Sequence, residues 1–202
     1  MKLLSSFVVG GFLLAFGIPA AAQIPADSSD KPASEKYLTD VQLQDQTGKT
    51  LRLYSDLMKG HTVVIIPFFT SCTAVCPPMN ATMRRVQTLL GDRVGKDIVM
   101  ISISVDPATD TPERLAAYAA KFKAGPGWFF ITGKKENLEV ALKKLGSYVD
   151  DKNEHSPTMS IGNVTTGLWK KIYALSKPDT LVTQIEEVAN DKGDQSNRQT
   201  SP

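Results

Sequence analysis

The sequence predicts an α/β protein with a mixed central β-sheet flanked by helices and with an N-terminal β-hairpin. Two continuous apolar runs rich in β-branched residues, at 61–69 and 98–105, have the composition of strands buried on both faces. A helical spacing of apolar residues follows each run, which indicates a parallel strand–helix–strand unit with helices covering the sheet. Two short strands, at 158–161 and 168–174, flank a turn at 163–167 and predict a late antiparallel hairpin.

The remaining elements follow from local signals. Residues 41–44 and 50–53 alternate apolar and polar side chains around a turn at 45–48, which predicts the N-terminal hairpin. Thr111 offers a capping hydroxyl immediately before Pro112, a residue that is favoured at the first position of a helix. Helices are expected at 77–90, 111–122, 134–145 and 178–188, with a short strand at 128–131. A small domain with this order of elements is most often thioredoxin-like, and we predict that fold here.

The two ends of the chain differ in composition from its middle. Residues 1–22 start with Lys2, continue through an apolar run and end in small residues, which is typical of a cleaved signal peptide. An uncleaved N-terminal anchor is the alternative. We interpret 23–36 as a flexible linker, 37–189 as the thioredoxin-like domain and 190–202 as a disordered tail. The expected location is therefore outside the cytoplasm, in the periplasm or at the outer face of the cytoplasmic membrane.

Composition narrows the possible functions. The 202 residues carry 23 basic and 21 acidic side chains, so the formal net charge is only +2, and the lysines are dispersed along the chain. A nucleic-acid-binding protein needs a concentrated basic face, so we expect no nucleic-acid partner. A domain of this length can bury a sufficient core without disulfides, which leaves its two cysteines available for chemistry. Both lie in the exported portion, where disulfides can persist.

Cys72 and Cys76 stand four residues apart, where a predicted buried strand ends and a helix begins. Because a proline disfavours helical geometry at the residue before it, we expect the helix to start at about Pro77 or Pro78, with both thiols in the preceding loop. The amides and dipole of a helix N-terminus stabilise thiolates, and so short a loop also permits a disulfide. The pair is therefore predicted to bind a metal or exchange thiols. An inert disulfide that stiffens the loop is the alternative.

The chain contains two histidines. His61 opens a predicted buried strand, and we interpret it as a structural residue. His155 precedes a late strand, in a loop that should lie against the cysteine loop of a thioredoxin-like sheet. Two thiolates and one imidazole make a soft, three-ligand set, which favours Cu(I). Structural zinc is disfavoured because it would need a fourth ligand, such as Asp150 or Asp151.

Three motifs, in this order, resemble the Sco/SenC family of copper proteins. Residues 69–77 (FTSCTAVCP) are similar to the family's F-T-x-C-x-x-x-C-P signature. The segments 101–107 and 110–113 are similar to its S-V-D-P-x-x-D-T-P-E motif, and His155-Ser156 is similar to its late D-H-[ST] element. The resemblance covers the whole predicted folded domain. This chain departs from the pattern at Glu154, which replaces the aspartate, and in the short polar segment before it.

The resemblance implies a copper protein that helps to build the dinuclear copper centre of cytochrome c oxidase. Carried over to this chain, the copper ligands are Cys72, Cys76 and His155. They would hold Cu(I), whereas Cu(II) would need a fourth ligand or water. The implied partner is a copper-accepting membrane protein such as a cytochrome c oxidase subunit, with other thiol or copper proteins as further candidates, and we expect a monomer. Asp106 matches an aspartate near the family's site, and we interpret it as capping a turn with Pro107.

Two enzymatic alternatives remain open. In a thiol-disulfide oxidoreductase, Cys72 would attack and Cys76 would resolve the mixed disulfide, to reduce a partner's copper-ligand cysteines. Pro157 supports this alternative because it stands where thioredoxins carry a cis-proline, so a cis Ser156–Pro157 bond is our hypothesis. A peroxidase is disfavoured because the peroxiredoxin motif P-x-x-x-T-x-x-C is absent: Thr70 lies only two residues before Cys72.

Overall fold

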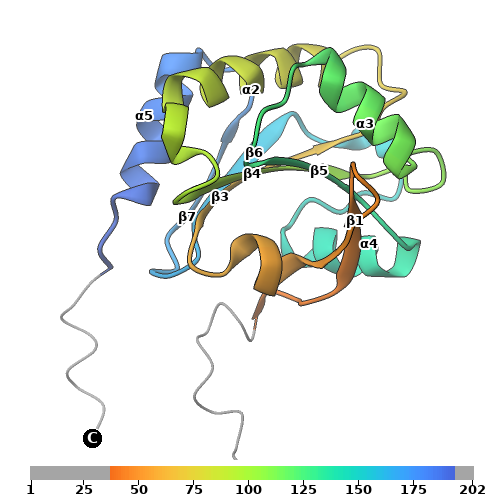
Figure 1. Cartoon of the computed structure of the whole chain (residues 1–202), viewed down its shortest axis with the longest axis horizontal. Coiled ribbons are helices and arrows are strands. Elements are labelled where there is room, and N and C mark those ends of the chain that lie inside the picture. Colours follow the sequence, from red (N-terminus) through yellow and green to blue (C-terminus); the bar gives the residue numbers. More distant parts are fainter. Residues whose placement is uncertain (1–36, 194–202) are drawn as a thin grey trace, which may run out of the picture. The chain divides into compact units, whose positions relative to one another are not determined.

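The computed structural model describes residues 37–193, which form a seven-stranded sheet with helices on both faces (Figure 1). The expected mixed α/β architecture is confirmed. The predicted signal peptide (1–22), the linker (23–36) and residues 194–202 of the predicted tail lie outside the described residues. Within the described part of the chain, no helix is long and apolar enough to cross a membrane.

The sheet contains three parallel strands at its centre and antiparallel strands on either side. Its strands are β1 (Gln42–Asp45), β2 (Thr50–Arg52), β3 (Thr62–Phe68), β4 (Ile98–Ser104), β5 (Trp128–Thr132), β6 (Thr158–Asn163) and β7 (Trp169–Tyr173). They lie in the order β2-β1-β5-β4-β3-β6-β7. Strands β3, β4 and β5 are parallel, whereas β1 is antiparallel to β5 and β6 is antiparallel to β3. Every residue of β3 and β4 is buried, as their composition predicts.

Helices cover both faces of this sheet (Figure 1). The longer ones are α2 (Cys76–Leu90), α3 (Pro112–Lys121), α4 (Lys135–Lys144) and α5 (Pro178–Ala189). The buried side chains of α2, α3 and α5 belong to one apolar cluster. Those of α4 and of the π-helical segment η2 (Leu53–Met58) belong to a second cluster on the opposite face. The predicted helices are confirmed, and Thr111 caps α3 by accepting a hydrogen bond from the Arg114 amide.

The topology brings three loops to one edge of the sheet. Parallel strands β3 and β4 are in register from Thr62 opposite Ile98 to Phe68 opposite Ser104, so both end at this edge. Strand β6 runs antiparallel to β3 and therefore begins close to where β3 ends. Consequently the loop after β3, the loop after β4 and the loop before β6 meet there. The carboxyl ends of parallel strands are the usual position of ligand sites in α/β sheets.

Candidate functional site

The two cysteines occupy different environments at the start of α2. The helix begins at Cys76, earlier than the sequence predicted, because Val75 already has helical angles (φ −91°, ψ −31°) and its carbonyl accepts the Met79 amide at 3.1 Å. Pro77 fits in the first turn, where an amide would have no helical partner. Cys76 is completely buried, whereas Cys72 remains in the loop and is partly exposed. Both are free thiols.

The sulfur of Cys72 lies at the amide end of the helix. Its Sγ accepts the Cys76 backbone N–H at 3.4 Å, in the way that a side chain caps a helix. Burial raises the pKa of the Cys72 thiol, but hydrogen bonds from the Cys76 side chain and from the amides of residues 74–76 outweigh it. The pKa of Cys72 therefore lies below its usual value, which favours a thiolate.

Cys76 and His155 are in direct contact. Cys76 Sγ lies 3.3 Å from His155 Nε2, and the imidazole is 5% exposed. On the other side of the ring, Nδ1 lies 2.7 Å from the carbonyl oxygen of Lys152. Because a carbonyl only accepts, Nδ1 carries the proton, and in the neutral ring Nε2 presents its lone pair to Cys76. Metal-binding histidines commonly donate their second N–H in this way.

The burial of Cys76 keeps it protonated. Burial raises the pKa of the Cys76 thiol to about 12, and its hydrogen bond with Cys72 adds to the rise. The thiol has a single proton, which it can donate either to Cys72 or to His155 Nε2, and the second donation accounts for the 3.3 Å contact. Cys72 is therefore the better nucleophile of the pair, and Cys76 must lose a proton before it can bind a metal ion.

Asp110 fixes the start of the cysteine loop. This completely buried carboxylate accepts the Thr70 amide (3.1 Å) and hydroxyl (2.5 Å) and the Ser104 hydroxyl (2.6 Å). It thereby ties the loop after β3 to the end of β4. Asp110 belongs to the motif at 110–113, but the sequence alone indicated no role for it. Its partners lie up to 40 residues away in the chain, so only the motif itself could have pointed to it.

A second buried polar network supports the first turn of α2. Asn80 is completely buried, and its Nδ2 donates to the Cys76 carbonyl (2.9 Å) and to the Tyr118 hydroxyl oxygen (3.4 Å). Trp128 Nε1 donates to Ser102 Oγ at 3.0 Å, and that hydroxyl donates in turn to Asn80 Oδ1 at 3.5 Å. Burial, together with the nearby thiols, raises the pKa of Tyr118, which therefore stays neutral. These side chains hold Cys76 in place, and no pattern in the sequence had pointed to Asn80.

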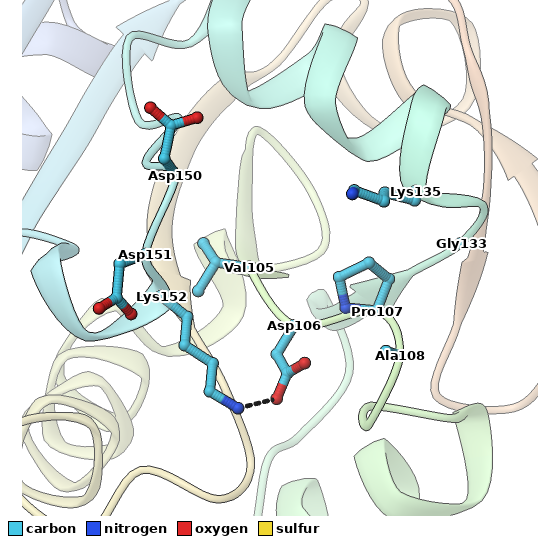
Figure 2. A pocket seen from close by; sticks show the side chains of 9 residues that line it. All are labelled: Val105, Asp106, Pro107, Ala108, Gly133, Lys135, Asp150, Asp151 and Lys152. Carbon is cyan, nitrogen blue, oxygen red and sulfur yellow. Dashed lines mark hydrogen bonds and ion pairs between the residues drawn. The ribbon is translucent and has the colours of Figure 1, made fainter.

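The loop before β6 carries His155 to the thiols. It contains the short 3-10 helix η4 (Lys152–Glu154), whose residue Lys152 extends its ammonium group to Asp106, with Nζ 2.6 Å from Oδ2. Figure 2 shows these two side chains pointing toward each other, with Asp150 and Lys135 at separate places in the lining of the same cavity. The cavity has a volume of about 590 Å³. The ring of Phe69 meets the His155 imidazole nearly edge-on, at 5.3 Å between centroids and 74° between planes. The imidazole is thus held from several directions.

Asp106 differs in part from its predicted role. Its backbone carbonyl closes the expected turn by accepting the Thr109 and Asp110 amides at 3.0 and 2.9 Å. Its side chain, however, pairs with Lys152 across the cavity edge, which the sequence did not indicate. Burial raises the pKa of the Asp106 carboxyl, but hydrogen bonds from Lys152 and Thr109 outweigh it and hold that pKa below its usual value. The carboxylate is therefore charged near neutral pH.

The hypothesis of a cis bond before Pro157 is wrong. No cis peptide bond occurs among residues 37–193. Instead, the Thr158 amide donates to the Ser156 carbonyl at 2.7 Å, and the Pro157 carbonyl accepts the Ala174 amide at 2.9 Å. A tight three-residue turn around the proline thus leads the chain into β6. The bond to Ala174 extends the pairing of β6 with β7 by one residue.

Asp150 and Asp151, the possible fourth ligands of the disfavoured zinc site, and His61, interpreted as structural, have surroundings of their own. Asp150 accepts the Tyr148 hydroxyl at 3.0 Å, and Asp151 accepts the Asn153 amide at 2.9 Å. His61 lies at the opposite end of β3, where its Nδ1 is buried without a hydrogen-bond partner. Within the described chain, no three Cys, His, Asp or Glu side chains are already grouped closely enough to hold a metal ion. Cys76 and His155 are in direct contact, and the Cys72 thiol shares a hydrogen bond with the Cys76 thiol.

A family model and a relative of known family agree on the family that this chain resembles. Residues 29–190 match the SCO1/SenC family model. The SCO1 protein homolog of Bacillus subtilis (strain 168) is 38% identical over 109 residues, which are 52% of this chain and 55% of that protein. The chain thus spans about half the length of this relative.

Solved structures agree with the sequence comparison. A SCO1/SenC family lipoprotein from Bacillus anthracis str. Ames has 30% identity and a TM-score of 0.65, covering 76% of this chain and 95% of that one. BsSco, in which a disulfide switch was identified, belongs to the Sco family of cytochrome c oxidase assembly proteins. It has 27% identity and a TM-score of 0.62, covering 75% and 92%. The predicted thioredoxin-like fold is confirmed, and the chain belongs to the SCO1/SenC family.

Proposed function

We propose that this protein binds copper through Cys72, Cys76 and His155 and delivers it for assembly of the copper centre of cytochrome c oxidase. The observation that carries the proposal is the 3.3 Å contact between Cys76 Sγ and His155 Nε2. With Nδ1–H donated to the Lys152 carbonyl, Nε2 is the free ligand atom of the ring. The partly exposed Cys72 lies four residues before Cys76 and supplies the third soft donor, a combination that favours Cu(I).

Each ligand has a distinct role in this proposal. Cys72, with its lowered pKa and partial exposure, would meet incoming copper first as a thiolate. Cys76 would follow after losing its proton, and His155 would complete the set from the buried side. Delivery would reverse this order, since a partner's thiol reaches the exposed sulfur more readily than the buried one. Copper is the cargo of this exchange.

The cellular setting is part of the proposal. BsSco is a member of a family of cytochrome c oxidase assembly proteins, and the Bacillus anthracis relative is a lipoprotein. Together with the signal-like residues 1–22, this supports export to the periplasm or to the outer face of the cytoplasmic membrane. The recipient would be a copper-accepting membrane protein such as an oxidase subunit, met by a monomer of this chain.

A Cu(I) titration tests the copper site. The full chain, reduced under nitrogen, is titrated with Cu(I) against a competing chelator, alongside His155→Ala and the matched control His61→Ala. We expect one tightly bound copper per chain. Affinity should fall in His155→Ala by more than the roughly 10- to 100-fold that loss of an outer hydrogen-bond partner costs, and stay within about twofold in His61→Ala. Equal affinity of wild type and His155→Ala would refute the proposal.

The asymmetry of the two thiols also favours a second candidate, a thiol-disulfide oxidoreductase. An attacking cysteine of lowered pKa beside a buried one raised to about 12 is the arrangement that thiol exchange needs. At pH 8, a thiol of pKa about 12 is ionised in roughly one molecule in ten thousand, so iodoacetamide should modify Cys72 long before Cys76. Mass spectrometry measures the order in which the two cysteines are modified, and the chain unfolded in guanidinium serves as the reference in which both are accessible. Preferential modification of Cys76, or a reduction potential below about −300 mV, would exclude this candidate.

A further inference from the structure

Lys152 joins the loop that carries His155 to the rest of the site. Its backbone carbonyl accepts the imidazole Nδ1–H at 2.7 Å, which sets the orientation of the ring. Its ammonium group, at the far end of the same residue, pairs with Asp106 at 2.6 Å (Figure 2). The ammonium also lies 5.2 Å from the centre of the Phe69 ring, on the cysteine side of the site. Lys152 therefore contacts His155 through its backbone carbonyl, and Asp106 and Phe69 through its ammonium group.

Asp106 is a fixed attachment point for Lys152. Its amide donates to Ser104 Oγ at 3.0 Å, and its carbonyl accepts the Asp110 amide at 2.9 Å. Ser104 and Asp110 belong to the buried network that holds Thr70 at the start of the cysteine loop. A continuous set of hydrogen bonds thus runs from the cysteine loop to the histidine loop, and the Asp106–Lys152 ion pair is its link between the two loops.

The Asp106–Lys152 pair differs from an ordinary surface ion pair. The Asp106 side chain is only 11% exposed, and Lys152 is 36% exposed. A suitable comparison is Lys170 with Glu187, which is equally close but has an acidic side chain that is 51% exposed. Exposed pairs are screened by water and hold little geometry. The Asp106–Lys152 pair is largely shielded at its acidic end, so it can constrain the loop.

We infer that Lys152 is a positioning residue: by pairing with Asp106 it holds its own carbonyl against His155 and keeps Nε2 directed at Cys76. The inference rests on the proposed copper site, since it explains how a short loop presents the third ligand. Lys152 binds no copper itself. Its ion pair sets the orientation of the ring before any metal arrives.

The test combines a metal-free measurement with copper affinity. In the reduced, metal-free full chain, ¹⁵N NMR of the imidazole should show a protonated, slowly exchanging Nδ1 on His155. Lys152→Met should lose this protected N–H signal and weaken Cu(I) binding by about 10- to 100-fold, the usual effect of losing an outer partner. Lys152→Arg, which keeps the positive charge, should retain both the protected N–H signal and the wild-type copper affinity. Lys170→Met is the matched control and should change neither.

Further variants distinguish the possible failures. Asp106→Asn breaks the same ion pair from the other side, so it serves if Lys152→Met does not fold. Because both substitutions break the same ion pair, the double variant Lys152→Met/Asp106→Asn should bind copper no more weakly than the weaker-binding single variant. An unchanged N–H signal and a copper affinity within twofold in both single variants would overturn the inference. If the wild type binds no copper but Lys152→Met still loses the N–H signal, the proposed function fails while the positioning role stands.

Discussion

The two ends of strands β3 and β4 carry similar residues in opposite circumstances. At the carboxyl end, Asp110 is buried with three hydrogen bonds, and both nitrogens of His155 have partners. At the amino end, Asp97 is 51% exposed and pairs with Arg93, four residues before it. His61 at that end has a buried Nδ1 with no partner. Both ends thus carry aspartate and histidine, but only at the carboxyl end do the side chains of Asp110 and His155 bond to distant loops.

The two ends differ in the contacts of these side chains and not in residue type. The Asp97–Arg93 ion pair lies within one local segment, and its further partner is the exposed Glu186 of α5, 3.8 Å from Arg93. Asp110, by contrast, contacts a residue 40 positions away, and His155 contacts Cys76 across 79 positions. Polar groups that are buried and joined across distant segments are costly to leave unpaired, so they define one arrangement. The carboxyl end is therefore the part of the sheet edge with a fixed geometry.

The largest expected difference concerns the two aspartates. Asp110→Ala should lower the free energy of unfolding by about 3–5 kcal/mol, because it leaves the buried Ser104 hydroxyl and the partly buried Thr70 amide and hydroxyl without their acceptor. Asp97→Ala should cost only about 0–1 kcal/mol, since its ion pair is exposed to water. Urea denaturation of the metal-free protein measures both. Similar losses from the two variants would contradict the contrast between the ends.

A second prediction concerns the pH dependence of copper affinity. Since the pKa of Cys76 is raised to about 12, this thiol is protonated throughout the neutral range and must release its proton when copper binds. Its contribution alone should raise the affinity about tenfold for each pH unit between pH 6.5 and 8.5.

Two variants identify the source of that slope. Chelator competition measures the copper affinity of Cys76→Ser as a function of pH. Whatever the absolute affinity of this variant, the slope of log affinity against pH should be smaller than that of wild type by about one, since the roughly tenfold change per pH unit due to Cys76 is lost. His61→Ala, at the other end of the strand, should keep the wild-type slope. An unaltered slope in Cys76→Ser would mean that Cys76 does not lose a proton on binding.

The smallest expected effects come from replacing each histidine by phenylalanine. His155→Phe should destabilise the metal-free protein by about 1–2 kcal/mol, because it leaves the Lys152 carbonyl without its donor. His61→Phe removes a buried nitrogen that has no partner, and should be neutral or stabilising by up to about 1 kcal/mol. Thermal and urea unfolding compare the two. A loss in His61→Phe as large as in His155→Phe would show that His61 has an unrecognised structural bond.

Much of the fold could be predicted because its signals are local. The buried strands are continuous apolar runs, and α3 begins at a capping threonine followed by proline, so both could be read from neighbouring residues. The pairing of β1 with β5 and the π-helical turn at Leu53–Met58 could not. Strand pairing is decided by which edges meet in three dimensions, and no short pattern in the sequence encodes that choice.

The site shows the same division. Cys72, Cys76 and His155 were predicted as ligands from residue type and motif, and the structure brings Cys76 and His155 into contact. The start of α2 at Cys76 was missed, because tertiary contacts override the preference that proline imposes on the residue before it. The Asp106–Lys152 pair was also missed, since it spans 46 positions and depends on the particular length of the histidine loop.

The separation of 79 positions between Cys76 and His155 has a consequence for how the chain matures. Contacts between distant residues form late in folding, since the entropy of closing the loop must first be overcome. Both thiols also precede the imidazole in the chain, so during synthesis they emerge before the group that partners one of them. Under the proposed function, high copper affinity arises only once β6 has paired with β3. Copper would then act as a selective stabiliser of finished molecules, shifting the folding equilibrium toward the native state.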